Sequence, residues 1–190
     1  MRLLLHVCCS PCLCAPLEEL KKDSLEIEGF FYNPNIHPLL EFRRRLKSVK
    51  VYQESSPVRI HYCEDYGLNE FLETVERYDA PQRCNDCYHM RLTATARHAR
   101  ANGFDAFSTA LLFSDRQKHE LLKKVGEEVS HREGLPFYYM DYRHLYAESH
   151  EMARKRCLYL QSYCGCVFSE QERYDPTTKY LYKGNLNVRS

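Results

Sequence analysis

Three tight groups of cysteines are the residues of this chain best suited to chemistry. Seven of the ten cysteines fall into them, each group at metal-ligand spacing: Cys8, Cys9 and Cys12; Cys84 and Cys87; Cys164 and Cys166. Thiolates two or three residues apart can present two sulfurs to one ion or cluster, and sulfur-rich sites select zinc or iron–sulfur clusters over hard cations. One tetrahedral zinc or one cubane cluster normally takes four sulfurs. Seven sulfurs therefore indicate a redox metal centre with a second metal, an open position or a redox thiol beside it.

The groups differ in what their spacing implies. Cys84 and Cys87 lie near the start of a predicted helix, where the macrodipole lowers thiol pKa values and favours thiolate. Alone, this pair is equally consistent with a thioredoxin-like dithiol or half of a zinc knuckle. Gly165 lets the backbone bend closely around a cluster. The adjacent Cys8 and Cys9 are expected to face different partners, a cluster and a neighbouring metal, rather than one small ion.

The remaining cysteines carry a weaker signal. Cys63 and Cys157 are interpreted as small apolar residues, and Cys14 as part of a helix with ligation the less favoured alternative. The apolar run at residues 2–7 is too short for a secretory segment or a membrane span, so we expect a soluble, cytoplasmic protein. In a reducing cytosol, this many cysteines favour metal or thiol chemistry over a disulfide scaffold.

Short apolar strands alternate with helices along the chain and must position these groups. Strands are predicted at 2–7, 27–32, 58–62, 104–109 and 137–140, and helices at 16–22, 39–53, 68–78, 84–101, 117–132 and 149–163. This alternation predicts one domain over 1–190, a Rossmann-like three-layer α/β/α sandwich with a mainly parallel sheet. Ligands of such sheets bind beyond the carboxyl ends of strands, where the first cysteine group falls. The last helix would fold back to deliver Cys164 and Cys166.

Several other residues are candidates for proton transfer or substrate binding. His37 and His119 lie in turn-rich segments that could border a pocket, although a capping or surface histidine explains each equally well. Ser114 or Asp115 is expected to cap the following helix. Asp86 and Tyr88 flank Cys87 and could orient a metal ligand or donate a proton. Glycine-rich phosphate-binding motifs are absent from the sequence, so nucleotide use has no support.

Charge gives only local signals. The formal net charge is +1, but Arg43, Arg44 and Arg45 with Lys47 and Lys50 form one basic stretch, and Arg154, Lys155 and Arg156 form another. Either could contact phosphates, although for each alone a solvated helix face is the favoured interpretation. The 15 tyrosines suit either stacking on bases or half-buried packing.

Five linked motifs run in order along nearly the whole chain. They are His6-Val-Cys-Cys-Ser-Pro-Cys12, Phe31-Tyr-Asn-Pro-Asn-Ile-His-Pro38, Arg83-Cys-Asn-Asp-Cys-Tyr88 with Arg91-Leu92, Gly103-Phe-Asp105 and Tyr163-Cys-Gly-Cys166. Together they resemble one known family, the QueH-type epoxyqueuosine reductases. The resemblance implies an α/β/α fold related to the PP-loop, or HUP, group, with cysteine chemistry in place of the phosphate loop. One departure is Ser114-Asp-Arg-Gln117, where the family pattern is Ser-Pro-Tyr-Gln, which puts any role of Asp115 or Arg116 in doubt.

The resemblance also implies a reaction. It is the cobalamin-independent reduction of epoxyqueuosine to queuosine at the wobble position of tRNAs for aspartate, asparagine, histidine and tyrosine, the last step of queuosine biosynthesis. Turning an epoxide into an alkene needs two electrons and two protons and releases water. A cubane cluster passes one electron at a time, so a neighbouring Lewis-acidic iron would share the work. We therefore expect the seven cysteines to hold a 4Fe-4S cluster and an additional iron or other divalent metal, in a partition that the sequence leaves open.

Roles follow for the other candidates. Asp86, Tyr88 or His119 would protonate the departing oxygen. The substrate-binding candidates are Asn33, His37, Tyr88, Arg91 and Gln117. A splayed-out base of the anticodon stem-loop would stack on aromatic or arginine side chains, for which Tyr88, Arg91 and Arg43 to Arg45 are candidates. Electrons would come from an external donor.

Two alternatives from other classes remain at this stage. A non-catalytic zinc-binding module would use the cysteines to fold and the basic stretches to bind tRNA. A thiol–disulfide oxidoreductase would use Cys84 and Cys87 and leave the other groups without a role.

Overall fold

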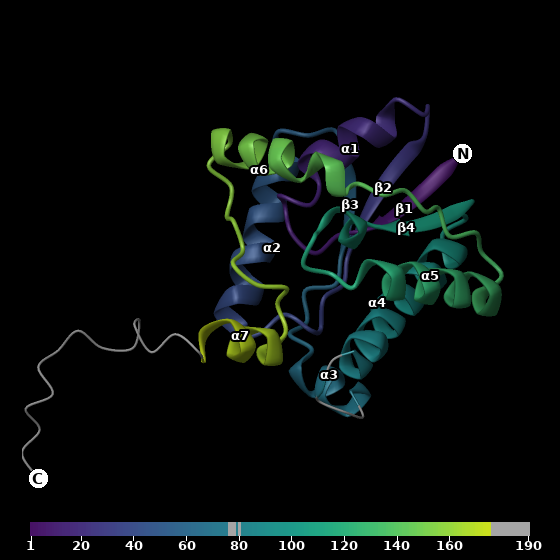
Figure 1. The fold of residues 1–190 in the computed structure, drawn as a ribbon. Coiled ribbons are helices and arrows are strands. Elements are labelled where there is room, and N and C mark those ends of the chain that lie inside the picture. Colours follow the sequence, from purple (N-terminus) through teal and green to yellow (C-terminus); the bar gives the residue numbers. More distant parts are fainter. Residues whose placement is uncertain (76–78, 80, 176–190) are drawn as a thin grey trace, which may run out of the picture.

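A four-stranded parallel sheet forms the centre of the molecule in the computed structural model, which describes residues 1–75, 79 and 81–175 (Figure 1). The strands are β1 (Arg2–His6), β2 (Glu26–Phe31), β3 (Arg59–Tyr62) and β4 (Ala106–Thr109), in the order β3-β2-β1-β4. Leu3, Leu4 and Leu5 of β1 are all fully buried, as expected for a strand covered on both faces. The predicted α/β class and parallel sheet are confirmed.

Helices cover both faces of this sheet. They are α1 (Cys14–Lys21), α2 (Leu39–Glu54), α3 (Leu68–Thr74), α4 (Gln82–Ala101), α5 (His119–Glu133), α6 (Tyr146–Lys155) and α7 (Val167–Tyr174), with short 3-10 turns at Ala110–Phe113 and Arg143–Leu145. Figure 1 shows α1, α2 and α6 on one side of the sheet and α4 and α5 on the other. Right-handed crossovers produce this arrangement, because the chain moves from β1 to β2 and β3 in one direction and returns to place β4 on the other side of β1.

The reversal of strand order beside β1 creates the crevice that positions the site. The loop after β1 carries Cys8, Cys9 and Cys12, and the loop after β4 carries residues 114–118. These loops diverge at the carboxyl ends of neighbouring strands, where open α/β sheets bind their ligands. The predicted location of the first cysteine group is confirmed.

The predictions of one strand and of the last helix are wrong. Residues 137–140 form no strand and make only an isolated bridge, in which Tyr138 donates its backbone N–H to Phe107 at 2.8 Å. The predicted helix over 149–163 ends much earlier, with α6 at Lys155, because Cys157 adopts a left-handed φ of 53° that a right-handed helix excludes. Residues 156–165 instead run as an irregular segment beside α2 (Figure 1).

Other boundaries shift by less. Helix α3 ends at Thr74, and the last predicted residues, 76–78, lie outside the described part of the chain. Helix α5 begins at His119 after Lys118, so neither Ser114 nor Asp115 caps it. Ser114 accepts the backbone N–H of Arg116 at 3.2 Å and so shapes the preceding turn. Within the described residues, no helix is long and apolar enough to cross a membrane.

Candidate metal centre

The N-terminal trio, Cys8, Cys9 and Cys12, brings three sulfurs together in one buried turn. The Cys8 sulfur lies 3.6 Å from that of Cys9 and 3.6 Å from that of Cys12, and all three lie within 4.8 Å of one another. A tetrahedral zinc with sulfur ligands at about 2.3 Å separates them by roughly 3.8 Å, so this spacing suits one ion. This geometry favours one shared ion over separate partners for Cys8 and Cys9, because the turn of residues 10–13 brings Cys12 close to both. The partner of each sulfur stays a prediction.

The remaining four cysteines form the second group, the four-cysteine pocket: Cys84, Cys87, Cys164 and Cys166 line one cavity. Cys84 and Cys87 lie in the first turns of α4, and Cys164 and Cys166 lie in the loop before α7. The sulfurs of Cys164 and Cys166 are 3.9 Å apart. Gly165 between them has a φ of 123°, and a Cβ there would lie 3.0 Å from Ile36 and 3.1 Å from Arg45. The predicted need for glycine in this bend is confirmed.

Burial and thiol–thiol hydrogen bonds set the protonation of both groups. Hydrogen bonds from Cys12 and Cys9 lower the pKa of Cys8, while burial raises the pKa of Cys9. In the four-cysteine pocket, the hydrogen bond from Cys166 lowers the pKa of Cys164 to about 5. Each group thus stabilises one thiolate and keeps its neighbour protonated, which is the charge state expected of close sulfurs without a cation between them.

The helix start does not activate Cys84 and Cys87 as predicted. Burial raises the pKa of Cys84 despite the nearby charges of Arg83 and Lys118. Burial also raises the pKa of Cys87, to about 11, despite the nearby charge of Arg91. Both thiols are therefore neutral at physiological pH in the metal-free protein, which is the opposite of a reactive dithiol pair.

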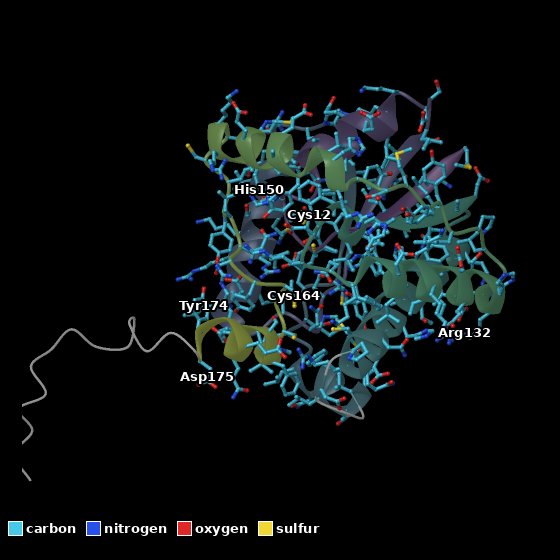
Figure 2. All side chains as sticks on the ribbon, in the orientation of Figure 1. Cys12, Arg132, His150, Cys164, Tyr174 and Asp175 are labelled. Atoms are coloured by element: carbon cyan, nitrogen blue, oxygen red, sulfur yellow. The ribbon has the colours of Figure 1, made fainter. Side chains whose placement is uncertain are left out.

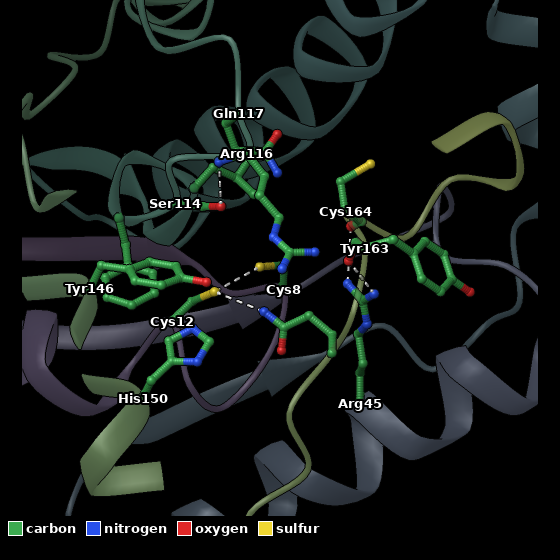
Figure 3. A pocket seen from close by; sticks show the side chains of 13 residues that line it. Cys8, Cys12, Arg45, Ser114, Arg116, Gln117, Tyr146, His150, Tyr163 and Cys164 are labelled. Atoms are coloured by element: carbon green, nitrogen blue, oxygen red, sulfur yellow. Dashed lines mark hydrogen bonds between the residues drawn. The ribbon is translucent and has the colours of Figure 1, made fainter. Parts of the chain in front are cut away.

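Cys164 borders three neighbouring cavities. It lines one with Cys8 and Cys12 (Figure 3), the four-cysteine cavity, and an open cleft that contains Arg116 and Lys118. Cys12 and Cys164, far apart in sequence, both lie in the middle of the fold in Figure 2. Cys164 therefore adjoins both sulfur groups and the open cleft.

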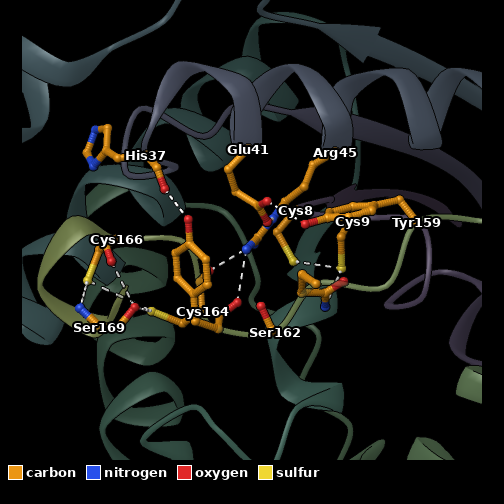
Figure 4. Close-up of polar contacts among 12 residues, drawn as sticks. Cys8, Cys9, His37, Glu41, Arg45, Tyr159, Ser162, Cys164, Cys166 and Ser169 are labelled. Atoms are coloured by element: carbon orange, nitrogen blue, oxygen red, sulfur yellow. Dashed lines mark hydrogen bonds and ion pairs between the residues drawn. The ribbon is translucent and has the colours of Figure 1, made fainter. Parts of the chain in front are cut away.

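Arg45 joins the two groups from the side of α2 (Figure 4). Its side chain is 1% exposed, donates to Glu41 at 2.7 Å, and donates to the carbonyls of Tyr163 and Cys164 at 2.9 and 3.0 Å. Arg45 therefore anchors the loop that carries Cys164. As a predicted RNA contact it is wrong, because the side chain faces the interior, whereas Arg43 and Arg44 are exposed.

The turn after β2 forms hydrogen bonds to the two loops that carry the trio and Gly165. Asn33 donates its side-chain amide to the carbonyl of Val7 at 2.8 Å and so fixes the chain entering the trio. His37 donates its backbone N–H to the carbonyl of Gly165 at 2.7 Å, and its carbonyl accepts the hydroxyl of Tyr163. Burial against Tyr66 and Phe71 lowers the pKa of His37 to about 4. Asn33 and His37 thus position loops, and neither lines the cavities that contain the cysteines.

Tyr88 and Gln117 lie at the junction of the cleft and the four-cysteine pocket. The Tyr88 hydroxyl donates to the Gln117 side-chain oxygen at 2.9 Å and accepts the backbone N–H of Lys118 at 3.0 Å. Burial raises the pKa of Tyr88. Gln117 lines all three cavities, so the structure brings these two candidates together with the sulfurs.

Asp86 and His119 point elsewhere. Asp86 accepts a hydrogen bond from Gln82 at 3.0 Å and lines a separate groove with His89 on another face of α4. His119 bonds to the Tyr139 hydroxyl at 2.9 Å. Neither residue lines a cavity that holds a trio or pocket cysteine, so the structure does not support either as a proton donor there. Cys14, Cys63 and Cys157 also lie outside these cavities, as expected.

Sequence reasoning missed several residues around the trio. Gln161 donates its side-chain amide to the Cys9 sulfur at 3.0 Å and lies 3.7 Å from that of Cys12. Tyr146 and His150, with ring centres 4.3 Å apart, line the same cavity, and burial lowers the pKa of His150. For Gln161 a signal existed in the sequence, because it lies three residues before Cys164. The incorrectly predicted helix over 149–163 included Gln161, so it was not considered as part of the site.

Comparison with known proteins gives a consistent family. The family model described as epoxyqueuosine reductase QueH matches residues 3–172. A protein named epoxyqueuosine reductase QueH from Dehalococcoides mccartyi is 33% identical over 173 residues, covering 91% of this chain and 94% of its own. The protein of that name from Thermotoga maritima is 33% identical over 179 residues, covering 90% and 91%. That from Staphylococcus epidermidis is 30% identical over 185 residues, covering 90% and 77%.

Among solved structures, a protein described as a predicted subunit of a tRNA methyltransferase from Methanocaldococcus jannaschii superposes with a TM-score of 0.48. It shares 13% sequence identity, with 86% of this chain and 94% of that chain covered, and a likeness at this level assigns neither fold nor function. The match of the family model over most of the chain does not depend on it. This chain belongs to the QueH family of epoxyqueuosine reductases, which are oxidoreductases.

Proposed function

We propose that this chain reduces epoxyqueuosine to queuosine at the wobble position of tRNAs for aspartate, asparagine, histidine and tyrosine, in the cytoplasm. The observation that carries the proposal is the meeting of the three cysteine groups in a chain of the QueH family. Cys164 lines both the cavity of Cys8 and Cys12 and that of Cys84, Cys87 and Cys166, and the Cys9 sulfur lies within 4.8 Å of those of Cys8 and Cys12. In the reaction both C–O bonds of the epoxide break and a carbon–carbon double bond forms. Two electrons and two protons enter, and the oxygen leaves as water.

The donor sets support a division of labour between the two groups. The four-cysteine pocket offers four thiols around a cavity, the number that a 4Fe-4S cluster takes. The trio offers three sulfurs at the spacing of one ion, and three protein ligands leave one position open for substrate. We assign the cluster to the pocket and the additional iron to the trio. When bound, they would supply electrons and Lewis acidity to the epoxide.

The remaining residues of the cavity bind and orient the substrate in this proposal. Tyr88 holds Gln117, which lines all three cavities, by a hydrogen bond of 2.9 Å. Of the three proton donors considered, only Tyr88 lines the cleft and the four-cysteine cavity, so we assign the protonation of the departing oxygen to it. Arg45 keeps Cys164 between both groups through the carbonyl bonds described above.

Charges around the open cleft favour an RNA substrate. Arg83, Arg116, Lys118 and Arg173 line it, against one acidic residue, Glu172. Cations at the mouth can contact the phosphates of the anticodon loop while an unpaired base enters, as in RNA recognition generally. Arg116, one of the two residues that differ from the family pattern Ser-Pro-Tyr-Gln, donates to the carbonyl of Ser162. Arg116 therefore lies at the mouth of the cleft.

Metal analysis of anaerobically purified protein tests the proposal. We expect brown protein with iron and acid-labile sulfide, which converts epoxyqueuosine in an anticodon stem-loop to queuosine when a chemical reductant is added. Colourless protein with stoichiometric zinc and no turnover would support the zinc-binding RNA module and reject the reductase. Metal-free protein with a reversible Cys84–Cys87 disulfide would support the thiol oxidoreductase.

A further inference from the structure

Arg91 is a buried cation without a carboxylate. Its side chain lies within the core, with 2% of the residue exposed, and its Nε and Nη2 atoms have no hydrogen-bond partner. Its Nη1 atom lies 3.8 Å from the Cys87 sulfur. Throughout residues 1–75, 79 and 81–175, no carboxylate lies within ion-pair distance of it. Arginine stays protonated in proteins, so this charge cannot be removed by titration.

Arg45 shows that the fold can neutralise such a charge. It is as deeply buried, yet Glu41 lies 2.7 Å from its Nε atom, and two carbonyls accept its remaining donors. Both arginines border the sulfur cavities. The difference between them is therefore the missing carboxylate at Arg91, and not a difference in burial.

The position of Arg91 indicates where its anion must lie. Helix α4 places it one turn after Cys87 and two turns after Cys84, and it lines the cavity of the four-cysteine pocket. His6 cannot supply the anion, because an imidazole is neutral or cationic, and its ring nitrogens bind the Tyr32 carbonyl and the Thr109 hydroxyl at 3.1 and 3.0 Å. The groups near the guanidinium that can become anionic are the cysteine sulfurs.

We propose that Arg91 is the counter-charge of the four-cysteine pocket. Its guanidinium offsets the negative charge of the thiolates and of the electron that an external donor adds there, which raises the reduction potential of the bound cluster. A buried ion without a partner is unfavourable, whereas the same ion beside a permanent anion is not. The proposal rests on the proposed function, since it needs a cluster at that place. It also replaces RNA stacking as the role of Arg91, because the side chain is out of reach of a base at the surface.

The first test compares anaerobic Arg91→Met and Arg91→Lys with the wild type and with Arg97→Met, an exposed arginine of the same helix as control. The potential is titrated while the spectrum of the cluster is recorded. At the wild-type midpoint we expect the reduced-to-oxidised ratio of Arg91→Met to fall about tenfold, which is 59 mV for a one-electron couple. Arg91→Lys should restore most of it, and KM for the anticodon stem-loop should not change. An unchanged midpoint in Arg91→Met overturns the proposal.

The second test separates a counter-charge from a packing residue. In the metal-free protein Arg91→Met removes a buried charge that has no carboxylate partner and two unbonded nitrogens, so its melting temperature should equal or exceed that of the wild type. In the iron-loaded protein the same variant should melt lower than the wild type. A variant that is less stable in both forms would show that Arg91 serves packing and would overturn the proposal.

A third measurement distinguishes failure of the Arg91 proposal from failure of the proposed function. If the wild type contains no iron or sulfide, the proposed function fails, and Co²⁺ alone is then added to metal-free protein. A counter-charge predicts that Arg91→Met binds Co²⁺ at least about tenfold more weakly than Arg91→Lys, measured by sulfur-to-cobalt absorption. Equal affinities would overturn the inference about Arg91.

Discussion

The trio and the four-cysteine pocket reach similar chemistry by different routes. All three trio sulfurs come from one turn, residues 8–12, so local backbone geometry sets their spacing. The pocket combines the start of α4 with a loop before α7 that is fixed by Arg45 and the turn at His37. Its sulfurs therefore depend on long-range packing. We conclude that damage to the trio should stay local, whereas damage to any support of the pocket should displace its ligands.

The largest expected effect tests the division between the groups. Cys84→Ala or Cys166→Ala should remove acid-labile sulfide and lower turnover by at least about 100-fold, because the proposed cluster would lose one of its four ligands. Cys9→Ala should lower turnover equally while retaining the sulfide and losing about one iron per chain. Iron and sulfide counting with a turnover assay measures both, and Cys63→Ala is the control. Equal loss of sulfide from Cys9→Ala would contradict the assignment.

Acid should loosen the support of the pocket through His37. Its pKa is about 4 when folded and 6.5 when unfolded, so below pH 6.5 the unfolded chain binds a proton that the folded one excludes. Stability from this residue is complete above pH 6.5 and falls by about 1.4 kcal/mol per pH unit toward pH 4, about 3 kcal/mol in all.

Denaturant unfolding of metal-free protein at pH 7 and pH 4.5 measures this loss. His37→Phe keeps an aromatic ring against Tyr66 and Phe71 and should reduce the difference between the two pH values. His144→Phe, at an exposed position, is the control. If His37→Phe leaves the pH dependence unchanged, His37 is not responsible for it.

Gly165→Ala tests the geometry of the pocket loop directly. A Cβ at a φ of 123° is strained and would press on Ile36 and Arg45, so we expect about 2 kcal/mol of destabilisation and reduced iron content. Gly134→Ala also has a positive φ, 66°, but nothing lies within 4 Å of its Cβ, so its cost should be about 1 kcal/mol. Chemical denaturation compares the two, and equal costs would mean that the contacts of Gly165 have no weight.

The smallest effect belongs to Gln161 beside the trio. Gln161→Ala removes the N–H donor 3.0 Å from the Cys9 sulfur and should weaken metal binding at the trio by about 1 kcal/mol. Competition with a chelator measures this, and Gln171→Ala on the exposed face of α7 is the control. An unaltered affinity in Gln161→Ala would show that this hydrogen bond does not support the trio.

Much of the fold follows from local patterns. The apolar run of β1, the period of α2 and α4 and the left-handed Gly134 after α5 are features of short windows, and each element lies where it was predicted. The segment 156–165 is irregular because it docks on α2 through Arg45 and Tyr159, contacts that no window of sequence contains. The same docking decides the position of Cys164.

The sequence by itself determined the seven cysteines, their place after β1 and at the start of α4, and the resemblance to the QueH family. Only the tertiary structure decided that the sulfurs of Cys8, Cys9 and Cys12 lie within 4.8 Å of one another, that Arg45 and Arg91 are interior, and that Asp86 and His119 turn away from the sulfurs. The reason is that residue type fixes what a side chain can bind. Which face of a helix is covered, and by what, depends on packing between segments distant in sequence.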